Sequence, residues 1–158
     1  MRVGIGYDVH PLAEGSPLIL GGIEIKYNRI LVGWSDADVL LHSIMDALLG
    51  ASGLSDIGTH FPPSDHEYKN APSIVLLQKV KAMLQKDNWS IVNIDSTIVA
   101  EEPKLAPYID QMKQMISKHL DIDKSQIGIK ATTTEGLGFT GQGKGIAAYA
   151  VALIDNKK

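Results

Sequence analysis

The sequence contains no cysteine among its 158 residues, and this absence removes several kinds of chemistry at once. It excludes disulfides, a thiolate nucleophile and cysteine-ligated metal sites, so any metal must be held by His, Asp or Glu. The chain also lacks an excess of basic residues. Its formal net charge of −3 argues against a general binder of nucleic-acid phosphates. No apolar run reaches the roughly 18 residues that a membrane span requires.

A signal peptide is also missing from the start of the chain, because residues 1–6 lead directly into a strand-like pattern. We therefore expect a cytoplasmic protein that has neither a membrane nor a nucleic acid as partner. A length of 158 residues with 44% hydrophobic residues suits one domain spanning residues 1–158.

Periodicity predicts an α+β fold, with a sheet covered by helices on one face. Apolar residues at every second position from Val3 to Val9 predict a strand with one buried face. Residues 18–25 suit a hairpin or a bulged strand, and a buried helix is expected from Val39 to Leu49. The polar stretch 55–70 predicts a long ordered loop. Later elements are expected as a helix capped by Ser73, a helix starting at Pro107, and strands over 89–100 and 127–131. The almost continuous apolar run 146–154 suits a central strand, although its length alone does not exclude a helix.

Two polar groups could meet at the end of the first strand. Asp8 and His10 lie on the same side of that strand, and Asp38, His42 and Asp46 share one face of the apolar helix. The stripe on the helix suits either an internal Asp–His–Asp network, or a metal-ligating His42 whose other ring nitrogen is oriented by a carboxylate. Asp8 could also cap a turn, with His10 solvated. Joined together, Asp8, His10 and His42 would give three non-thiol ligands and an open fourth position, as in catalytic zinc sites.

Two further segments invite a phosphate interpretation. Residues 130–136 (KATTTEG) suit either a solvated turn or a site for phosphate oxygens beside a Mg²⁺-binding carboxylate. Residues 138–144 match the G-x-x-x-x-G-K pattern of nucleotide-binding loops. However, Gly145 stands where such a loop needs Ser or Thr, and the segment lies near the end of the chain, so nucleotide hydrolysis is disfavoured.

Several blocks together resemble the 2-C-methyl-D-erythritol 2,4-cyclodiphosphate synthase family of the non-mevalonate isoprenoid pathway. The resemblance runs from Arg2 to about Ile154, and it depends on the order and spacing of the blocks rather than on any single one. The blocks are residues 6–10 (GYDVH), 35–42 (SDADVLLH), 46–50 (DALLG), 56–62 (DIGTHFP), 103–104 (PK) and 130–139 (KATTTEGLGF).

The resemblance implies a homotrimeric, metal-dependent phosphorus–oxygen lyase with active sites between subunits. Its reaction would cyclise 4-diphosphocytidyl-2-C-methyl-D-erythritol 2-phosphate and release CMP, with the 2-phosphate attacking the β-phosphorus. Because the substrate carries its own nucleophile, the missing cysteine is no obstacle. Two divalent ions on adjacent phosphates would fold the substrate and screen its charge.

Residue roles also follow from the resemblance. Asp8, His10 and His42 would hold one Zn²⁺ per subunit, Glu135 would help hold Mg²⁺ or Mn²⁺ with the diphosphate, and Trp34 and Thr133 occupy catalytic positions. Residues 100–106 and 131–133 would form a cytidine pocket from the adjacent subunit. The resemblance implies that the substrate is contacted by Asp8, Val9, His10, Trp34, Ser35, Asp56, Ile57, Gly58, Phe61, Pro62, Pro63, Ser64, Asp65, Ala100, Glu101, Glu102, Pro103, Lys104, Leu105, Ala106, Ala131, Thr132, Thr133, Thr134, Glu135, Phe139 and Gln142.

Five positions depart from the family pattern. Trp34 replaces a common His that helps position the attacking phosphate, and its indole can donate one N–H but cannot carry charge. Pro63 replaces a frequent Asp of the covering loop. Gln142, Lys144 and Tyr149 replace residues at one end of the trimer channel, where isoprenoid diphosphates bind in the family. The alternative interpretation is therefore a non-catalytic ligand-binding or regulatory trimer of the same fold.

Overall fold

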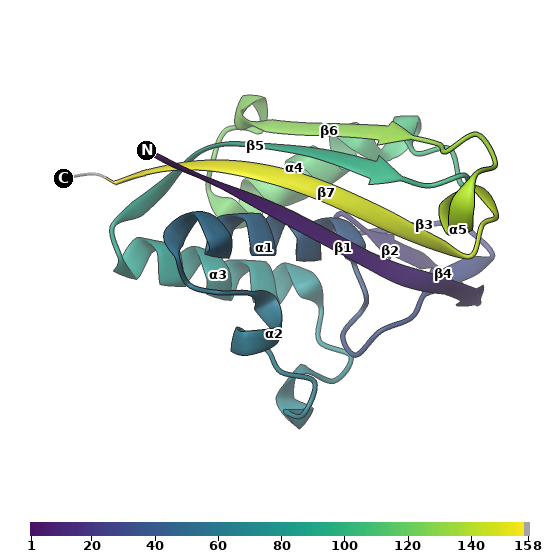
Figure 1. The fold of residues 1–158 in the computed structure, drawn as a ribbon, viewed down its shortest axis with the longest axis horizontal. Helices are drawn as coiled ribbons and strands as arrows, with labels where there is room; N and C mark the ends of the chain where they lie inside the picture. The colour runs from purple at the N-terminus through teal and green to yellow at the C-terminus, as the bar shows by residue number, and fades with distance from the viewer. Residues whose placement is uncertain (157–158) are drawn as a thin grey trace.

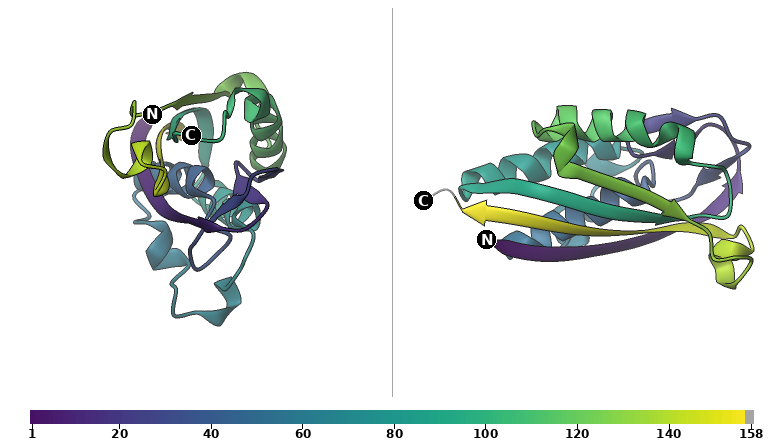
Figure 2. Two further views of the ribbon diagram at one scale, coloured as in Figure 1. Left: turned by 90° about the vertical axis from the view of Figure 1, so that its right-hand side faces the viewer. Right: turned by 90° about the horizontal axis from the view of Figure 1, so that it is seen from above.

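The computed structural model describes residues 1–156, which form a five-stranded sheet with helices packed on one of its faces (Figure 1; Figure 2, right). The strand order is β4-β1-β7-β5-β6, and only the β5–β6 pair is parallel. The strands are β1 (Arg2–Glu14), β4 (Arg29–Leu31), β5 (Trp89–Val99), β6 (Ile127–Thr132) and β7 (Gly145–Asn156). The predicted α+β class with one helical layer is confirmed.

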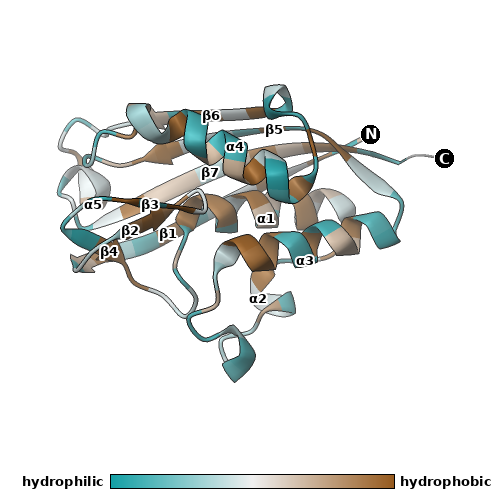
Figure 3. Ribbon diagram, turned by 180° about the vertical axis from the view of Figure 1, so that it is seen from behind, coloured by the Kyte–Doolittle hydropathy of each residue, from teal (hydrophilic) through white to brown (hydrophobic). Residues whose placement is uncertain are grey.

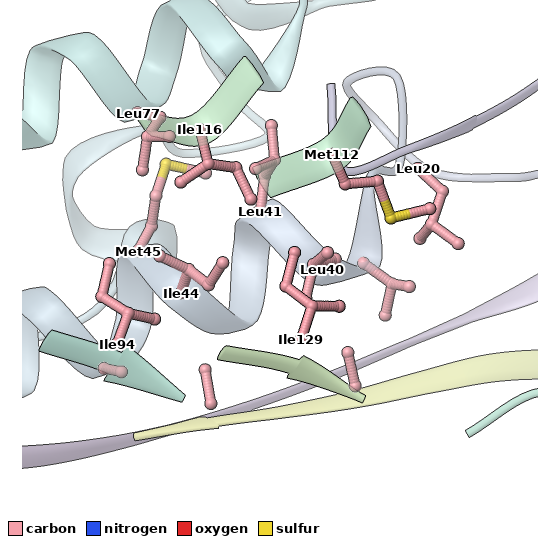
Figure 4. Close-up of a cluster of buried hydrophobic side chains, with 14 of the residues drawn as sticks. Leu20, Leu40, Leu41, Ile44, Met45, Leu77, Ile94, Met112, Ile116 and Ile129 are labelled. Carbon is pink, nitrogen blue, oxygen red and sulfur yellow. The ribbon is translucent and has the colours of Figure 1, made fainter. Parts of the chain in front are cut away.

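The helix expected from Val39 forms the centre of the core. It is α1 (Val39–Ser52), and it lies across β1 and β7 with apolar side chains buried around most of its circumference. Asp38 caps its first turn by accepting the Leu41 N–H, and Gly53 ends it in a left-handed conformation. Figure 4 shows side chains of α1 packed between sheet residues and two other helices.

Those two helices cover the side of α1 that faces away from the sheet. They are α3 (Ser73–Lys86) and α4 (Ile109–Leu120), the latter preceded by the short η2 (Ala106–Tyr108) that contains Pro107. The ribbon of α4 alternates between hydrophilic and hydrophobic colours in Figure 3, as expected for a helix buried through one stripe. Ser73 is the first residue of α3 rather than its cap, because Pro72 occupies the cap position.

The face of β1 that packs against the core is the opposite of the predicted one. Gly4 and Gly6 face α1, whereas the apolar side chains from Val3 to Val9 lie on the opposite face and are 39–72% exposed. A Cβ on Gly6 would lie 1.9 Å from the carbonyl oxygen of Ser43. The close approach of two backbones, rather than side-chain hydrophobicity, therefore decides which face of β1 meets the core.

Residues 18–25 form the hairpin that was one of their two expected forms, with strands β2 (Leu18–Leu20) and β3 (Ile23–Ile25). The loop predicted over 55–70 is more ordered than expected, because it contains the short helices α2 (Ile57–His60) and η1 (His66–Tyr68). Near the C-terminus, η3 (Lys124–Gln126) precedes β6, and α5 (Gly138–Gly141) precedes β7. Within residues 1–156, no helix has the length and apolar character needed to cross a membrane.

The P-loop interpretation of residues 138–144 does not fit this arrangement. A phosphate-binding loop opens a long helix, whereas α5 has only four residues and leads into the extended strand β7. The backbone N–H of Lys144 also bonds to the Phe139 carbonyl, which closes the segment as a compact turn. The sequence match is therefore coincidental.

Candidate functional site

Two elements bring three metal-ligating side chains together beside the first strand. Asp8 and His10 come from β1, and His42 comes from the facing side of α1. The Asp8 Oδ2 atom lies 2.9 Å from both His10 Nε2 and His42 Nδ1, and these two nitrogens are 3.1 Å apart. The three ligand atoms predicted from the strand and helix spacing thus converge on one point.

The chemistry of this triad fits a divalent cation. His10 Nδ1 donates to the Val32 carbonyl at 3.1 Å, so the Nε2 lone pair of the neutral ring faces Asp8 and His42. A carboxylate oxygen and imidazole nitrogens converging at about 3 Å repel one another unless a positive charge lies among them. Two nitrogens and one oxygen are also the donor set that zinc accepts in catalytic sites.

The pKa values of Asp8 and His10 show the same electrostatic preference. Partial burial alone would raise the pKa of Asp8, but hydrogen bonds and charge interactions with His10 and His42 outweigh it and lower the pKa to about 2. Burial would lower the pKa of His10, but the Asp8 carboxylate raises it above its usual range. The site therefore attracts positive charge, as a proton or as a cation.

The expected Asp–His–Asp network on α1 was wrong. Asp38 is fully buried, and its carboxylate accepts backbone N–H groups from Gly21, Gly22 and Leu41 at 2.7–3.1 Å. Asp46 accepts the backbone N–H of Ile57 at 2.8 Å. The two carboxylates therefore fix the β2–β3 turn and the start of α2, and neither pairs with His42.

The triad lies at the edge of a cleft of about 170 Å³. Tyr68 and Leu76, which the sequence did not suggest, add apolar walls from η1 and α3. Among the predicted site residues, the cleft is lined by Asp8, His10, Trp34, Ser35, His42, Ile57, Gly58, Phe61 and Pro63. Asp56 instead caps α2 through the Thr59 backbone N–H at 2.8 Å.

Trp34 lies at the mouth of this cleft and contacts the covering segment 62–70. Its indole N–H donates to the Asp65 carbonyl at 3.3 Å, and its carbonyl accepts the Asn70 N–H at 2.8 Å. The ring also faces His66, with centroids 6.1 Å apart, and Lys69. The one donor of the indole is thus directed to the covering segment, and a phosphate-positioning role for Trp34 stays a prediction.

Predicted residues 100–106 and 131–135 lie elsewhere, at the carboxyl ends of β5 and β6. Four others, namely Val9 on the opposite face of β1 from the triad and Pro62, Ser64 and Asp65 before η1, do not line the cleft. The Ala100 N–H bonds to the Thr132 carbonyl at 3.0 Å, which places residues 100–106 beside residues 131–135. Thr133 Oγ1 donates to Glu135 Oε1 at 2.9 Å at an exposed turn. None of residues 100–106 or 131–142 lines the cleft that holds the triad. One chain therefore carries two separate groups of predicted site residues.

Comparison with known protein families places the chain in one of them. The family model described as the YgbB family matches residues 1–155. The chain belongs to the YgbB family. Its relatives in Syntrophomonas wolfei subsp. wolfei and Clostridium kluyveri are 58% and 59% identical to it and are named 2-C-methyl-D-erythritol 2,4-cyclodiphosphate synthase. These alignments cover 98% and 99% of this chain and 99% and 95% of the relatives. The resemblance to this synthase family is confirmed.

Solved structures of bacterial and Plasmodium proteins have the same fold. The bifunctional IspDF of Campylobacter jejuni matches with a TM-score of 0.95 at 39% identity, over 99% of this chain and 42% of that larger protein. The IspF–CDP complex of Plasmodium falciparum matches with a TM-score of 0.87 at 36% identity, over 99% and 97% of the two chains. The fold that positions the triad is therefore shared with synthases from distant organisms.

Proposed function

We propose that the chain is a single-domain, metal-dependent enzyme of the non-mevalonate isoprenoid pathway. It cyclises 4-diphosphocytidyl-2-C-methyl-D-erythritol 2-phosphate to 2-C-methyl-D-erythritol 2,4-cyclodiphosphate. The observation that carries this proposal is the convergence of Asp8, His10 and His42 in a chain 58–59% identical to named synthases over nearly its whole length. The CDP complex of the Plasmodium falciparum relative supports a cytidine nucleotide as part of the substrate.

In this reaction, a 2-phosphate oxygen attacks the β-phosphorus of the diphosphate. The P–O bond to the α-phosphate breaks, and CMP leaves with the electron pair. Zn²⁺ at the triad, together with Mg²⁺ or Mn²⁺ near Glu135, would neutralise phosphate charge and act as Lewis acids. The chain itself folds and holds the substrate, since an intramolecular displacement depends mainly on orientation. Phe61 and Tyr68 keep water from one side of the cleft, and Ser35 offers a hydroxyl to a phosphate oxygen there.

We further propose a homotrimer whose active sites are shared between subunits. The triad and the Thr133–Glu135 turn belong to separate regions of one chain, so a complete site requires a neighbour. A surface suited to such contacts exists on the sheet face opposite α1, where the exposed apolar side chains are Val3, Ile5, Tyr7, Val9, Tyr149 and Val151.

The test of activity uses the purified protein with Zn²⁺, Mg²⁺ and the cytidine substrate, and follows CMP by phosphorus NMR. We expect CMP and the cyclic diphosphate to appear together. The His42→Ala variant should lose zinc and most activity, whereas Lys144→Ala should retain activity. Ligand binding without CMP release would refute catalysis and favour the non-catalytic trimer.

Mixed trimers test whether sites are shared. His42→Ala and Thr133→Ala subunits are each inactive alone, but one mixed site can combine His42 of one subunit with Thr133 of its neighbour. Random mixing in equal amounts should restore about a quarter of the sites, since each intact half is present with a probability of about one half. No recovery after verified subunit exchange would contradict the shared site.

A further inference from the structure

His42 is held on both sides, and only one side belongs to the metal triad. Its Nδ1 atom faces Asp8 and His10, whereas its Nε2 atom faces two hydroxyls. Ser73 Oγ lies 2.9 Å from Nε2, and Ser35 Oγ lies 3.1 Å from it. The residue is only 6% exposed, so these hydroxyls, rather than bulk water, are the partners of Nε2.

The direction of the Ser73 hydroxyl is set by Asp36. One carboxylate oxygen of Asp36 accepts the Ser73 O–H in a very short hydrogen bond, and the other accepts the Ser73 backbone N–H at 2.8 Å. Ser73 is fully buried at the first position of α3, and within residues 1–156 Asp36 is the only carboxylate that accepts its proton. Because the single Ser73 proton points to Asp36, the oxygen presents a lone pair to His42 Nε2.

We propose that Asp36 and Ser73 form a relay that holds the Nε2 proton of His42 when a cation replaces the proton that Asp8 draws to Nδ1. The Nδ1 atom then presents its lone pair toward Asp8 and His10, in the form that a divalent cation needs. This inference builds on the proposed function, because it gives the cation site a second layer of support. Asp36 and Ser73 are positioning residues, and they act on the cation only through His42.

Ser35 has a different part in this arrangement. Its hydroxyl accepts the Ala37 backbone N–H at 3.3 Å, and the side chain lines the cleft. It has no carboxylate partner that would orient its proton, so it can turn toward a bound phosphate. The relay therefore depends on the buried serine of α3, and the serine in the cleft stays available to the substrate.

Cation affinity gives the first test. The variant Ser73→Ala removes the nearer of the two oxygens at Nε2 and the only one of them that Asp36 orients, and we expect it to bind Zn²⁺ or Co²⁺ about 10–100-fold more weakly, as changes to the partners of a metal ligand do. The matched control is Ser43→Ala, which removes another fully buried serine hydroxyl, one that donates to the Leu40 carbonyl. This control should keep the affinity of the parent in competition with a chromogenic chelator.

Nitrogen NMR of the ring in the Zn²⁺-loaded protein gives a second test. Without a cation, the Asp8 carboxylate 2.9 Å from Nδ1 draws a proton to that atom, so the relay acts when Zn²⁺ takes the place of this proton. In the Zn²⁺-loaded parent, we expect an Nε2 proton that exchanges slowly with solvent, because Ser73 accepts it. In Asp36→Asn, the oxygen should stay with the Ser73 N–H at 2.8 Å rather than with the Asp38 N–H at 3.2 Å, and the amide should turn toward the Ser73 oxygen. The Ser73 proton would then point to His42, and the Nε2 proton should exchange faster.

The outcomes separate this inference from the proposed function. Equal cation affinity of Ser73→Ala and Ser43→Ala, or equal exchange of the Nε2 proton in the Zn²⁺-loaded parent and Asp36→Asn, would overturn the relay while leaving the cyclase proposal intact. Absence of cation binding by the parent would overturn both. Weaker binding in Ser73→Ala together with faster Nε2 exchange in Asp36→Asn would establish the relay.

Discussion

Replacing Gly6 with alanine tests whether the close approach of β1 and α1 sets the geometry of the metal triad. An alanine Cβ would lie 1.9 Å from the Ser43 carbonyl oxygen and 2.8 Å from the Ala47 nitrogen. Carbon–oxygen contacts settle at about 3.3 Å or more, so the two backbones must separate by roughly 1.4 Å. Both opposing atoms belong to the backbone of a buried helix, which cannot move aside as a flexible side chain could.

The separation of the two backbones would lower the free energy of unfolding and would also displace the ligands of the metal triad. Inserting a methyl group into a well-packed core costs about 1–3 kcal/mol, and we expect a value near 3 kcal/mol because backbone must move. Asp8 is two residues from Gly6, and His42 precedes Ser43, so the same displacement reaches the triad. Functional geometries tolerate about 0.5 Å, and we therefore expect cation affinity to fall by at least about tenfold.

The assay combines urea unfolding with a Co²⁺ titration, and Gly50→Ala serves as the matched control. Gly50 lies on the same helix, but its nearest neighbour in space, the Ile5 carbonyl oxygen, would be 3.9 Å from an added Cβ. The control should be neutral or stabilised by up to about 1 kcal/mol, since alanine favours helix. Equal stability and equal Co²⁺ affinity in Gly6→Ala and Gly50→Ala would refute the reasoning.

Three further predictions concern groups around the site. Asp38→Asn should lower the free energy of unfolding in urea by about 2–4 kcal/mol, because a buried carboxylate that accepts three N–H groups becomes an amide; a loss below 1 kcal/mol would contradict this. In metal-free protein at pH 5, the lowered pKa of Asp8 predicts that the free energy of unfolding of the parent is about 2 kcal/mol larger than that of Asp8→Asn. This difference in stability should shrink as the pH falls from about 4 toward 2, and a difference that stays constant with pH would refute the prediction. Trp34→Phe removes the bond to the Asp65 carbonyl and should speed proteolysis within residues 62–70 about two- to fivefold, with unchanged global stability.

The elements that could be predicted from the sequence are those whose burial follows from side-chain pattern alone. The apolar circumference of α1 and the continuous apolar run of β7 both indicate central elements, and both lie at the centre of the fold. The face of β1 that packs against α1 could not be predicted in this way, because glycines carry no hydrophobic signal. A backbone that must approach α1 closely turns its apolar residues outward, which is the reverse of what alternation favours.

In the candidate site, too, some contacts follow from the pattern of side chains and others do not. The spacing of Asp8, His10 and His42 predicts their convergence, since strand and helix periodicity fix which side chains share a face. The partners of the carboxylates on and before α1 could not be predicted. Asp38 bonds to the β2–β3 turn and Asp36 to Ser73, both of which are contacts that only the packing of distant segments creates.

One strand connects the metal triad with the proposed subunit contact. In β1, the side chains of Gly4, Gly6, Asp8 and His10 share one face, and those from Val3 to Val9 share the other. Gly4 and Gly6 carry no side chain on that face, which lets α1 approach and brings His42 to Asp8, but the same alternation leaves an exposed apolar strip across β1 and β7. Exposed apolar strips of this kind are stable when another chain covers them. The glycines that build the triad thus also create the surface for assembly, so a change at Gly6 should weaken cation binding and trimer formation together.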